Sequence, residues 1–217
     1  MNLLLHDEKF ELLPEKALYW PQERVLTLSD LHLGKAESIQ AAGVPVPSGT
    51  HQVDLRVLER VLEKYPTDHV IILGDLVHNR NSWSSEIYND IRNFLLQYQE
   101  IHWTLIYGNH EKGSLEKLRT LPFHLQQNDI QIGTFLFSHG HHRSSSKYFE
   151  IQGHVHPQVK LRQGPLQMTL PCFHLQENQL TLPAFGSWTG GYTIRPKKGD
   201  RLFAIAQDHI FEVRDAI

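Results

Sequence analysis

The feature that most constrains this sequence is a series of polar signatures, each placed directly after an apolar segment. Strands are predicted at residues 24–30, 68–75 and 101–110. The motifs "SDLH", "GDLVH" and "YGNHE" stand where these strands end. Their apolar parts are continuous and rich in Val, Ile and Leu, which is typical of buried parallel strands. Amphipathic helices are predicted between them at residues 51–65 and 84–99. The order β-α-β-α-β follows, and it indicates a mixed α/β fold.

The second half of the chain has a different character. A Pro/Gly-rich loop at 41–50 precedes the first helix, and a short helix is predicted at 114–121. After residue 130 the chain consists of short apolar segments broken by turn residues, and each is predicted to be a strand. These segments are residues 131–140, 148–156, 166–175, 178–185, 200–207 and 209–214. With 217 residues, 40% of them hydrophobic, the chain is expected to form one domain over residues 1–217.

Composition narrows the possible environments and cofactors. The only cysteine is Cys172, which excludes an internal disulfide and a Cys-rich metal site. The N-terminal segment lacks the basic start of a signal peptide, and no segment is apolar for long enough to span a bilayer. A cytoplasmic protein without membrane association is therefore expected. The net charge of −3 provides no global positive field for nucleic acid, although a local patch could still bind it.

Eight polar residues stand where the predicted strands end. In open α/β sheets the functional crevice lies beyond the carboxyl ends of the strands, so residues that are distant in sequence can meet there. A strand alternates its faces with a period of two, so Asp30 and His32 are expected to project in the same direction. The full set is Asp30, His32, Asp75, Asn109, His110, His139, His154 and His156.

These residue types suit a pair of metal ions. Two neighbouring cations repel each other, and a bridging carboxylate reduces this repulsion. Asp75 suits the bridge, because Gly74 before it allows a tight turn off the strand. Neutral imidazoles and the Asn109 amide complete the coordination without adding negative charge, so the ions could still bind a phosphate and activate a hydroxide. With 15 histidines beside one Cys and two Met, Mn, Fe, Zn or Ni fits better than copper(I).

A plainer interpretation exists for each motif alone. Asp and Gly are ordinary turn residues, and a single His often fills a polar gap. The motifs gain their weight from occurring together, in this order and at strand ends. Lys35 and Arg80 follow predicted ligands and are either substrate-phosphate contacts or surface charges. His141 and His142 fit a solvated loop better than ligation, and no role is assigned to His78.

Two further groups of residues carry alternatives. "GSWTGGY" at 186–192 forms either a wall on which a base stacks or a tight hairpin with Trp188 in a core gap. Seven other histidines are expected in helices or isolated loop positions, as surface or satisfied core residues. They are His6, His51, His69, His102, His124, His174 and His209.

The joint pattern resembles the calcineurin-like metallophosphoesterases. D-x-H, G-D, G-N-H-[DE], a His before Gly, and G-H-x-H all occur in order between Asp30 and His156. The resemblance implies two packed mixed sheets flanked by helices, an αββα sandwich. It also implies two divalent ions, with Mn²⁺ favoured over Fe, Zn or Ni. The implied ligands are Asp30, His32, Asp75 and His156 for one ion, and Asp75, Asn109, His139 and His154 for the other. His110 would be a catalytic acid oriented by a carboxylate.

A narrower resemblance covers nearly the whole chain. "ALYWP", "DLHLGKAESIQAAGVPVPSGT", "GDLVHNR" and "LPAFGSWTGG" are similar to segments of the bacterial ligase-associated DNA damage response endonucleases. This resemblance implies phosphodiester hydrolysis on DNA and partners such as a ligase, helicase or exonuclease. The alternative is a phosphatase or phosphodiesterase for nucleotides or other small phosphate esters. A non-catalytic scaffold of the same fold is disfavoured, because scaffolds usually lose ligands and every ligand position is retained here.

Overall fold

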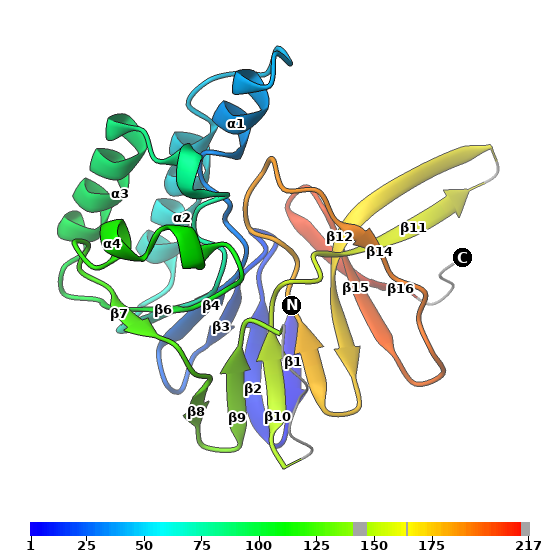
Figure 1. The fold of residues 1–217 in the computed structure, drawn as a ribbon. Coiled ribbons are helices and arrows are strands. Elements are labelled where there is room, and N and C mark those ends of the chain that lie inside the picture. Colours follow the sequence, from blue (N-terminus) through cyan, green and yellow to red (C-terminus); the bar gives the residue numbers. More distant parts are fainter. Residues whose placement is uncertain (141–146, 164, 214–217) are drawn as a thin grey trace.

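A first sheet of seven strands carries the N-terminal half of the chain (Figure 1). The computed structural model describes residues 1–140, 147–163 and 165–213, so the predicted loop histidines 141 and 142 lie outside the described residues. Strands β4 to β7 are parallel, and β1 to β4 are antiparallel. In spatial order the sheet contains β1 (Asn2–Leu5), β2 (Glu8–Leu12), β3 (Leu18–Trp20), β4 (Val25–Leu28), β5 (His69–Leu73), β6 (His102–Ile106) and β7 (His124–Gln126).

A second sheet of nine strands follows. It contains β8 (Ile130–Ile132), β9 (Phe135–Ser138), β10 (Phe149–Gln152), β11 (Pro157–Gln163), β12 (Leu166–Gln176), β13 (Gln179–Thr181), β14 (Tyr192–Thr193), β15 (Arg201–Ala206) and β16 (His209–Val213). The long strand β12 pairs with β11 over its first half and with β13 and β15 over its second. Both sheets mix parallel and antiparallel pairs, as the family resemblance implies.

Six helices precede β7 in the chain. They are α1 (Lys35–Ala41), α2 (Thr50–Lys64), η1 (Arg80–Ser82), α3 (Ser85–Gln97), η2 (Glu111–Gly113) and α4 (Leu115–Leu118), where η denotes a 3₁₀ helix. The predicted helices therefore form, although α4 is shorter than expected and α1 was not predicted. Among the described residues, no helix combines the length and the apolar character that crossing a bilayer requires.

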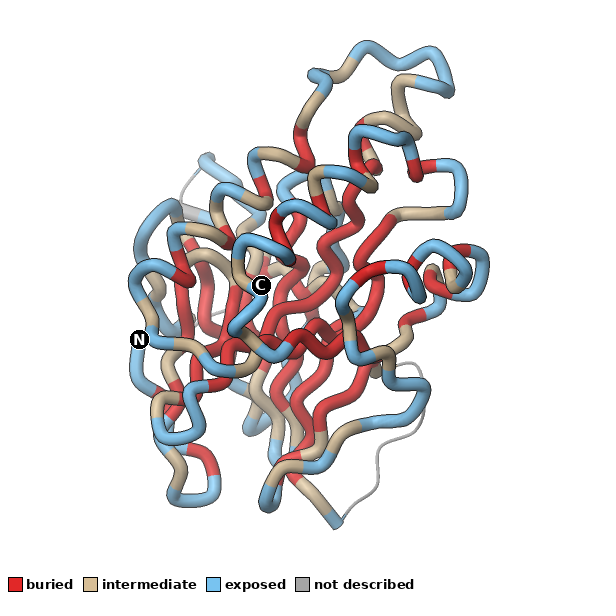
Figure 2. The backbone as a smooth tube through the Cα atoms, turned by 90° about the vertical axis from the view of Figure 1, so that its left-hand side faces the viewer, coloured by how far each residue is buried: buried red, intermediate tan, exposed pale blue. Residues whose placement is uncertain are grey.

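Alternation along the central strands builds two cores, one on each face of the first sheet. In β5, Val70 and Ile72 pack with the buried faces of α2 and α3, whereas Ile71 and Leu73 pack against the second sheet. Neighbouring residues of a strand point to opposite faces, so one continuous apolar run serves both cores. Figure 2 shows the buried backbone concentrated in these strands, with exposed loops around them. The result is the two-sheet sandwich that the resemblance implies.

Several short strands escaped prediction for identifiable reasons. β1 and β2 form a hairpin whose two turn residues, His6 and Asp7, both have positive φ, and this turn lacks the Asn-Gly or Asp-Gly signal of such turns. β7 and β14 are too short to show a period. In β11, Val159 and Leu161 alternate with polar residues, but the apolar pattern is only two residues long.

Candidate metal centre

Two of the polar loops run side by side beyond the ends of β4 and β5. The Asp30 amide donates to the Gly74 carbonyl at 3.2 Å, and the His32 amide donates to the Asp75 carbonyl at 2.9 Å. Leu33 and Val77 then form an isolated parallel bridge. The parallel pairing of the two strands is therefore continued through "SDLH" and "GDLVH", which fixes Asp30 and His32 relative to Asp75.

In Asp30 and Asp75, one carboxylate oxygen accepts a backbone hydrogen bond and the other faces the candidate metal centre. Asp30 Oδ2 accepts a hydrogen bond from the His154 amide at 2.8 Å, and Asp75 Oδ1 accepts one from the His110 amide at 3.0 Å. Their other oxygens face histidine rings: Asp30 Oδ1 lies 3.1 Å from His156 Nε2. Both aspartates are buried. Each carboxylate is thus anchored through one oxygen and offers the second one to the centre.

The offered oxygen of Asp75 lies between two groups of side chains. Asp75 Oδ2 is 3.7 Å from His32 Nε2 and also 3.7 Å from His139 Nε2. One group consists of Asp30, His32 and His156, and the other of Asp75, His139 and His154; within each, the potential ligand atoms lie within 4.8 Å of one another. Asn109 Oδ1 is 3.1 Å from His139 Nε2. The structure therefore brings all seven predicted ligands together, with Asp75 Oδ2 equally far from a histidine of each group.

Backbone carbonyls set the orientation of two of these rings. His139 Nδ1 lies 2.8 Å from the Leu73 carbonyl, and His156 Nδ1 lies 3.0 Å from the Gly190 carbonyl. A carbonyl only accepts, so Nδ1 carries the proton and Nε2 keeps its lone pair in the neutral ring. His139 Nε2 and Asn109 Oδ1 then face each other as two acceptors. A cation between them would stabilise this contact, as in other sites where a second partner fixes the histidine tautomer.

Buried polar atoms without partners provide the test of whether a metal fits. Within the part of the chain that the structure describes, Asp30 Oδ1, both ring nitrogens of His32 and His156 Nε2 are buried and have no hydrogen-bond partner; the 3.1 Å approach of Asp30 to His156 lacks hydrogen-bond geometry. Ligands bound to one ion at about 2.0–2.2 Å lie roughly 3 Å apart. Such atoms are costly to bury unless they have a partner, and a divalent cation satisfies them together. The residues present fit a metal.

At two of the predicted ligands, His32 and Asp30, electrostatics favour the protonation states that metal binding needs. Burial lowers the pKa of His32 to about 3, so its ring is neutral at physiological pH. Burial alone would raise the pKa of Asp30, but the His156 ring and the His154 amide outweigh burial and lower the pKa. Asp30 is therefore ionised. Two rim residues, Asn109 and His154, are exposed, so the centre is buried on one side and open to solvent on the other.

The backbone at the site is unusual. Five of the seven predicted ligands have φ between 46° and 69°: Asp30, His32, Asp75, His154 and His156. The left-handed region costs a side-chain-bearing residue about 1–2 kcal/mol, and such residues concentrate at functional sites. Close packing adds a constraint at Gly108, where a Cβ would lie 2.2 Å from Asp75 Oδ1. Only glycine fits there without displacing the shared carboxylate.

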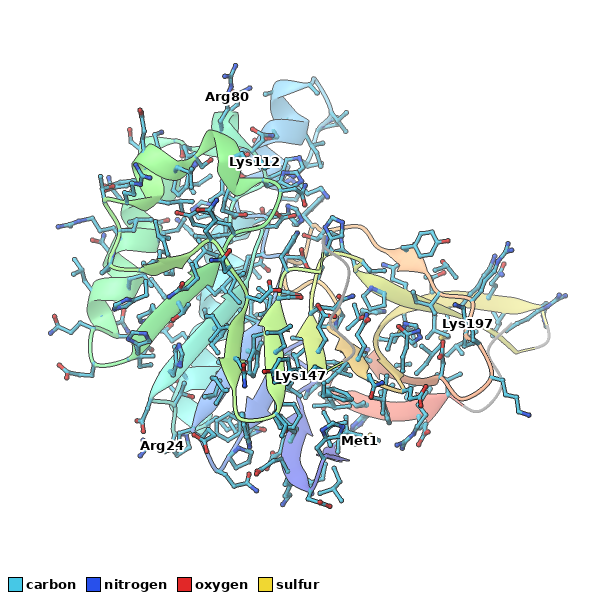
Figure 3. The ribbon with its side chains drawn as sticks, turned by 60° about the horizontal axis from the view of Figure 1, so that its bottom comes forward. Met1, Arg24, Arg80, Lys112, Lys147 and Lys197 are labelled. Atoms are coloured by element: carbon cyan, nitrogen blue, oxygen red, sulfur yellow. The ribbon has the colours of Figure 1, made fainter. Side chains whose placement is uncertain are left out.

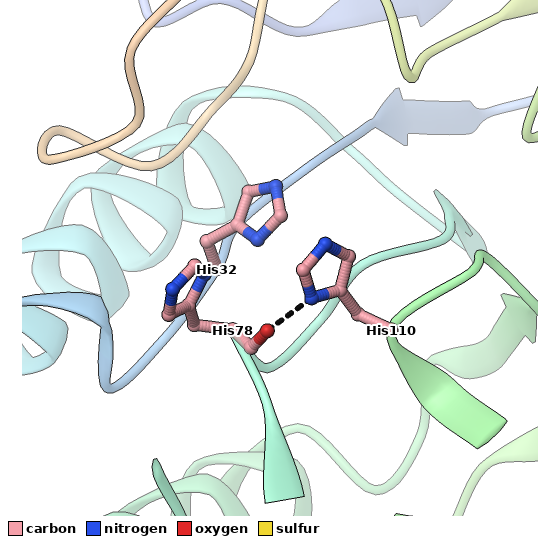
Figure 4. A group of neighbouring side chains, drawn as sticks. All are labelled: His32, His78 and His110. Carbon is pink, nitrogen blue, oxygen red and sulfur yellow. Dashed lines mark hydrogen bonds between the residues drawn. The ribbon is translucent and has the colours of Figure 1, made fainter. Parts of the chain in front are cut away.

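His110 lies beside the predicted ligands, but its orienting partner differs from the one implied by the family resemblance. His110 Nδ1 contacts the backbone carbonyl of His78, so a carbonyl rather than a carboxylate occupies this position (Figure 4). The Asp75 carboxylate lies at the other nitrogen, with Oδ2 3.8 Å from His110 Nε2. His78, His32 and His110 also form a third group able to hold a metal. The only indication in the sequence that His78 lies at the site is its position at the end of "GDLVH".

Glu111 is a residue that the sequence analysis overlooked. Its buried carboxylate accepts three backbone hydrogen bonds, from Asp75 at 3.1 Å, Leu76 at 2.8 Å and Gly108 at 2.8 Å. Burial, and next the charge of Asp75, raise the pKa of Glu111. The side chain ties the "GDLVH" loop to the "GNHE" loop. The motif itself contained the signal, since Glu111 directly follows His110.

The two predicted phosphate contacts lie in different settings. Lys35, at the start of α1, is partly buried, and burial lowers its pKa. Its charge also lowers the pKa of His32 and of His78, which places it near both rings. Arg80 begins η1 and is exposed. Neither position tests the predicted role.

The "GSWTGGY" segment lies against the predicted ligands. The Gly186 amide donates to the Asp30 carbonyl at 3.3 Å, and the Tyr192 amide donates to the His156 carbonyl at 2.9 Å. Trp188 is 38% exposed and Tyr192 65% exposed. Trp188 therefore does not fill a core gap, whereas the stacking of a base on this segment stays a prediction.

The other described histidines are accounted for by structural contacts. His51 is buried between Glu37 and Asp90, and His174 is paired with Asp200, so both are satisfied. The expectation that these seven histidines lie in helices or isolated loops was wrong for five of them. His69, His102 and His124 begin β5, β6 and β7, while His174 and His209 lie in β12 and β16.

Sequence and structure comparisons place this arrangement in a known family. The family model for calcineurin-like phosphoesterases matches residues 23–199. The chain belongs to the calcineurin-like phosphoesterase family. It is therefore a metal-binding hydrolase that acts on phosphoester bonds, as the motifs predicted. No curated protein sequence matches the chain.

Two of the solved structures that are similar to the chain cover most of its length. The crystal structure of Pseudomonas putida nuclease MPE is similar over nearly its whole length, with a TM-score of 0.86, 28% identity, and coverage of 98% of this chain and 99% of that one. Yfce, a phosphoesterase from E. coli, has a TM-score of 0.46 and 14% identity, covering 87% of this chain and 97% of that one. The second similarity is too low to support an inference.

Proposed function

We propose that this phosphoesterase uses two divalent metal ions, best supplied as Mn²⁺, to cleave phosphodiester bonds in DNA. The observation that carries the proposal is the position of Asp75 Oδ2, equidistant at 3.7 Å from a histidine of each metal-binding group. A carboxylate shared in this way is what two neighbouring cations require. Asp30, His32 and His156 would complete one site, and Asn109, His139 and His154 the other.

The protein's own groups have separate tasks in this proposal. Bound divalent cations supply Lewis acidity to a phosphate ester and to an attacking water. The Nδ1–H of His110 donates to the His78 carbonyl, so Nε2 is the nitrogen that takes up a proton from solvent before the reaction and delivers it to the leaving oxygen. The positive charge of Lys35 orients a non-bridging phosphate oxygen. No covalent phosphoenzyme is needed.

Nucleic acid as the substrate rests on two observations. The similar Pseudomonas putida protein is a nuclease, with 28% identity over nearly the full length. The exposed rings of Trp188 and Tyr192 lie on the segment bonded to Asp30 and His156, and exposed aromatic rings offer stacking surfaces for unpaired bases. We extend the proposal to a cytoplasmic endonuclease of DNA repair that works beside ligase, helicase or exonuclease partners.

One substrate series tests this function. Metal-replete protein is assayed on p-nitrophenyl phosphate, bis(p-nitrophenyl) phosphate, and closed circular single- and double-stranded DNA. An endonuclease converts circular DNA to linear or nicked forms, since a circle has no end for an exonuclease. Turnover of the monoester with no cleavage of either circle would instead identify a phosphatase of small esters. Asp75→Asn serves as the inactive control for each substrate.

A further inference from the structure

A basic pocket lies directly beyond the loops that carry His78 and His110. Its volume is about 290 Å³, and its walls come from η1, η2 and α4. η1 begins two residues after His78, and η2 begins immediately after His110. The two turns touch, because a Cβ at Gly113 would lie 3.3 Å from Arg80 Cβ. We call this the Arg80 pocket, defined by Arg80, Trp83, Lys112, Ser114, Glu116 and Lys117.

The charge of the Arg80 pocket is opposite to that of the whole chain. Three cations line it, Arg80, Lys112 and Lys117, against the single carboxylate of Glu116. The chain as a whole has a net charge of −3. Figure 3 shows Arg80 and Lys112 together at the top of the view, apart from Arg24, Lys147 and Lys197. Positive charge is therefore concentrated at the two turns that follow His78 and His110, where an anion entering the site would meet it.

Two residues of the same wall each carry a buried hydrogen-bond donor. Ser114 Oγ and Trp83 Nε1 are both buried, and neither has a hydrogen-bond partner among the described residues. Both residues line the pocket, and they are only 5% and 8% exposed. A buried donor without an acceptor is unfavourable by about 1–3 kcal/mol. A phosphate oxygen can accept from a hydroxyl, an indole N–H, a guanidinium and an ammonium group.

We infer that the Arg80 pocket binds a phosphate group of the nucleic-acid strand that flanks the scissile phosphate. This inference rests on the proposed function, since it requires a strand in the neighbouring metal centre. A small ester has no second phosphate to place there. The pocket therefore selects polynucleotides over small phosphate esters and holds the strand in register. Such contacts position a strand without reading its sequence.

Strand binding is measured by the fluorescence anisotropy of a labelled single-stranded 12-mer with metal-loaded His110→Asn protein, which keeps the strand uncleaved. In that background, Lys112→Gln with Arg80→Gln should weaken binding about 10-fold or more. Glu116→Gln should strengthen binding, because it removes the opposing charge. Lys197→Gln, a distant exposed cation, serves as the control and should change nothing. Removing one phosphate contact should also reduce the slope of log K against log salt by about 0.7.

Three outcomes would overturn the inference: equal affinities for the Lys112/Arg80 variant and its control, weaker binding by Glu116→Gln, or no strand binding at all. Inorganic phosphate is titrated in the same assay to separate a strand phosphate from a free anion. If inorganic phosphate displaces the labelled strand only at millimolar concentration, the pocket binds a phosphate of the strand. If it displaces the strand at a concentration equal to the Kd of the strand, the inference is overturned. The proposed function is tested separately by wild-type hydrolysis of bis(p-nitrophenyl) phosphate. If the wild type hydrolyses the diester but strand binding does not depend on Lys112, only the pocket inference is refuted. If strand binding depends on Lys112 but the wild type does not hydrolyse the diester, only the catalytic proposal is refuted.

Discussion

The shared position of Asp75 makes a prediction at the scale of one residue. Asp75→Asn keeps the shape of the side chain but replaces the charged oxygen between His32 and His139 with a neutral amide. An amide stabilises two adjacent cations poorly, so metal content should fall from about two equivalents, with activity falling at least 10–100-fold. Metal analysis and turnover on bis(p-nitrophenyl) phosphate measure both. The matched control is Asp208→Asn, at an exposed turn; equal losses in the two variants would refute the bridging role.

The contribution of His110 to the rate is expected to increase with the basicity of the leaving oxygen. A nitrophenolate leaves readily without one, whereas a deoxyribose alkoxide does not. His110→Asn should keep its metal, lose roughly 10²–10⁴-fold in kcat/KM on alkyl or DNA diesters, and lose less on aryl diesters. Comparing matched aryl and alkyl diesters decides the matter. Equal losses on both would indicate that His110 only positions phosphate.

Glu111 should behave as a structural joint between two loops. Glu111→Gln replaces one accepting oxygen with an NH₂ group that faces backbone N–H donors of Asp75, Leu76 or Gly108. Leaving buried donors unpaired should lower the free energy of unfolding by about 1–3 kcal/mol. Urea denaturation measures this loss. Glu100→Gln, on an exposed surface, should leave the unfolding free energy within about 0.5 kcal/mol of wild type.

At the scale of elements, the two ends of the parallel strands carry different histidines. The carboxyl ends lead to the metal-binding groups, while His69, His102 and His124 form a row at the amino ends of β5, β6 and β7. Ring centroids in this row are 4.6 and 4.2 Å apart. Burial, followed by the charges of His102 and His124, lowers the pKa of His69 to about 4. Folding therefore favours the neutral ring at His69.

This row predicts acid sensitivity away from the metal centre. The unfolded chain protonates His69 near pH 6.5, but the folded chain does so only near pH 4, so stability is present above 6.5 and is lost as pH falls towards 4. Allowing for solvent screening of the half-buried ring, about 1–2 kcal/mol should be lost. Urea unfolding at pH 7 and 4.5, with chelator throughout, measures this loss. His69→Gln should reduce the loss of unfolding free energy between pH 7 and 4.5, whereas the exposed His209→Gln should not. If the two variants unfold identically at both pH values, the histidine row is not the source of the loss.

The elements also show what sequence can predict and what it cannot. Strands β4, β5 and β6 were predicted because they are buried on both faces, which leaves a long apolar signature. The edge strands β1, β7 and β14 are short, and their pairing depends on distant partners rather than on local pattern. The seven predicted ligands come together because their motifs follow strands. The roles of Glu111 and the His78 carbonyl could not be read, because backbone contacts depend on how two loops pack.

At the scale of the whole molecule, the candidate metal centre joins the two sheets. Asp30 and Asp75 follow strands of the first sheet, whereas His139 and His154 follow β9 and β10 of the second. Metal bound here stabilises the native state, because the unfolded chain does not hold the ligands together. At 100-fold excess over Kd, each ion should add about 2.7 kcal/mol to the unfolding free energy. Calorimetry with Mn²⁺ and after chelation checks the rise in Tm; a similar rise in Asp75→Asn would exclude this centre as the origin.

The positive φ angles at five predicted ligands have a consequence for redesign. Asp and His, the side chains that bind hard and borderline metals, are also among the non-glycine residues that most readily adopt the left-handed backbone. Ligand chemistry and local conformation therefore demand the same two amino acids. An engineer who exchanges His154 or His156 for cysteine, to recruit a softer metal, changes the fit of the backbone as well as the donor atom. Metal preference in this scaffold is consequently easier to alter from the surrounding loops than from the ligands themselves.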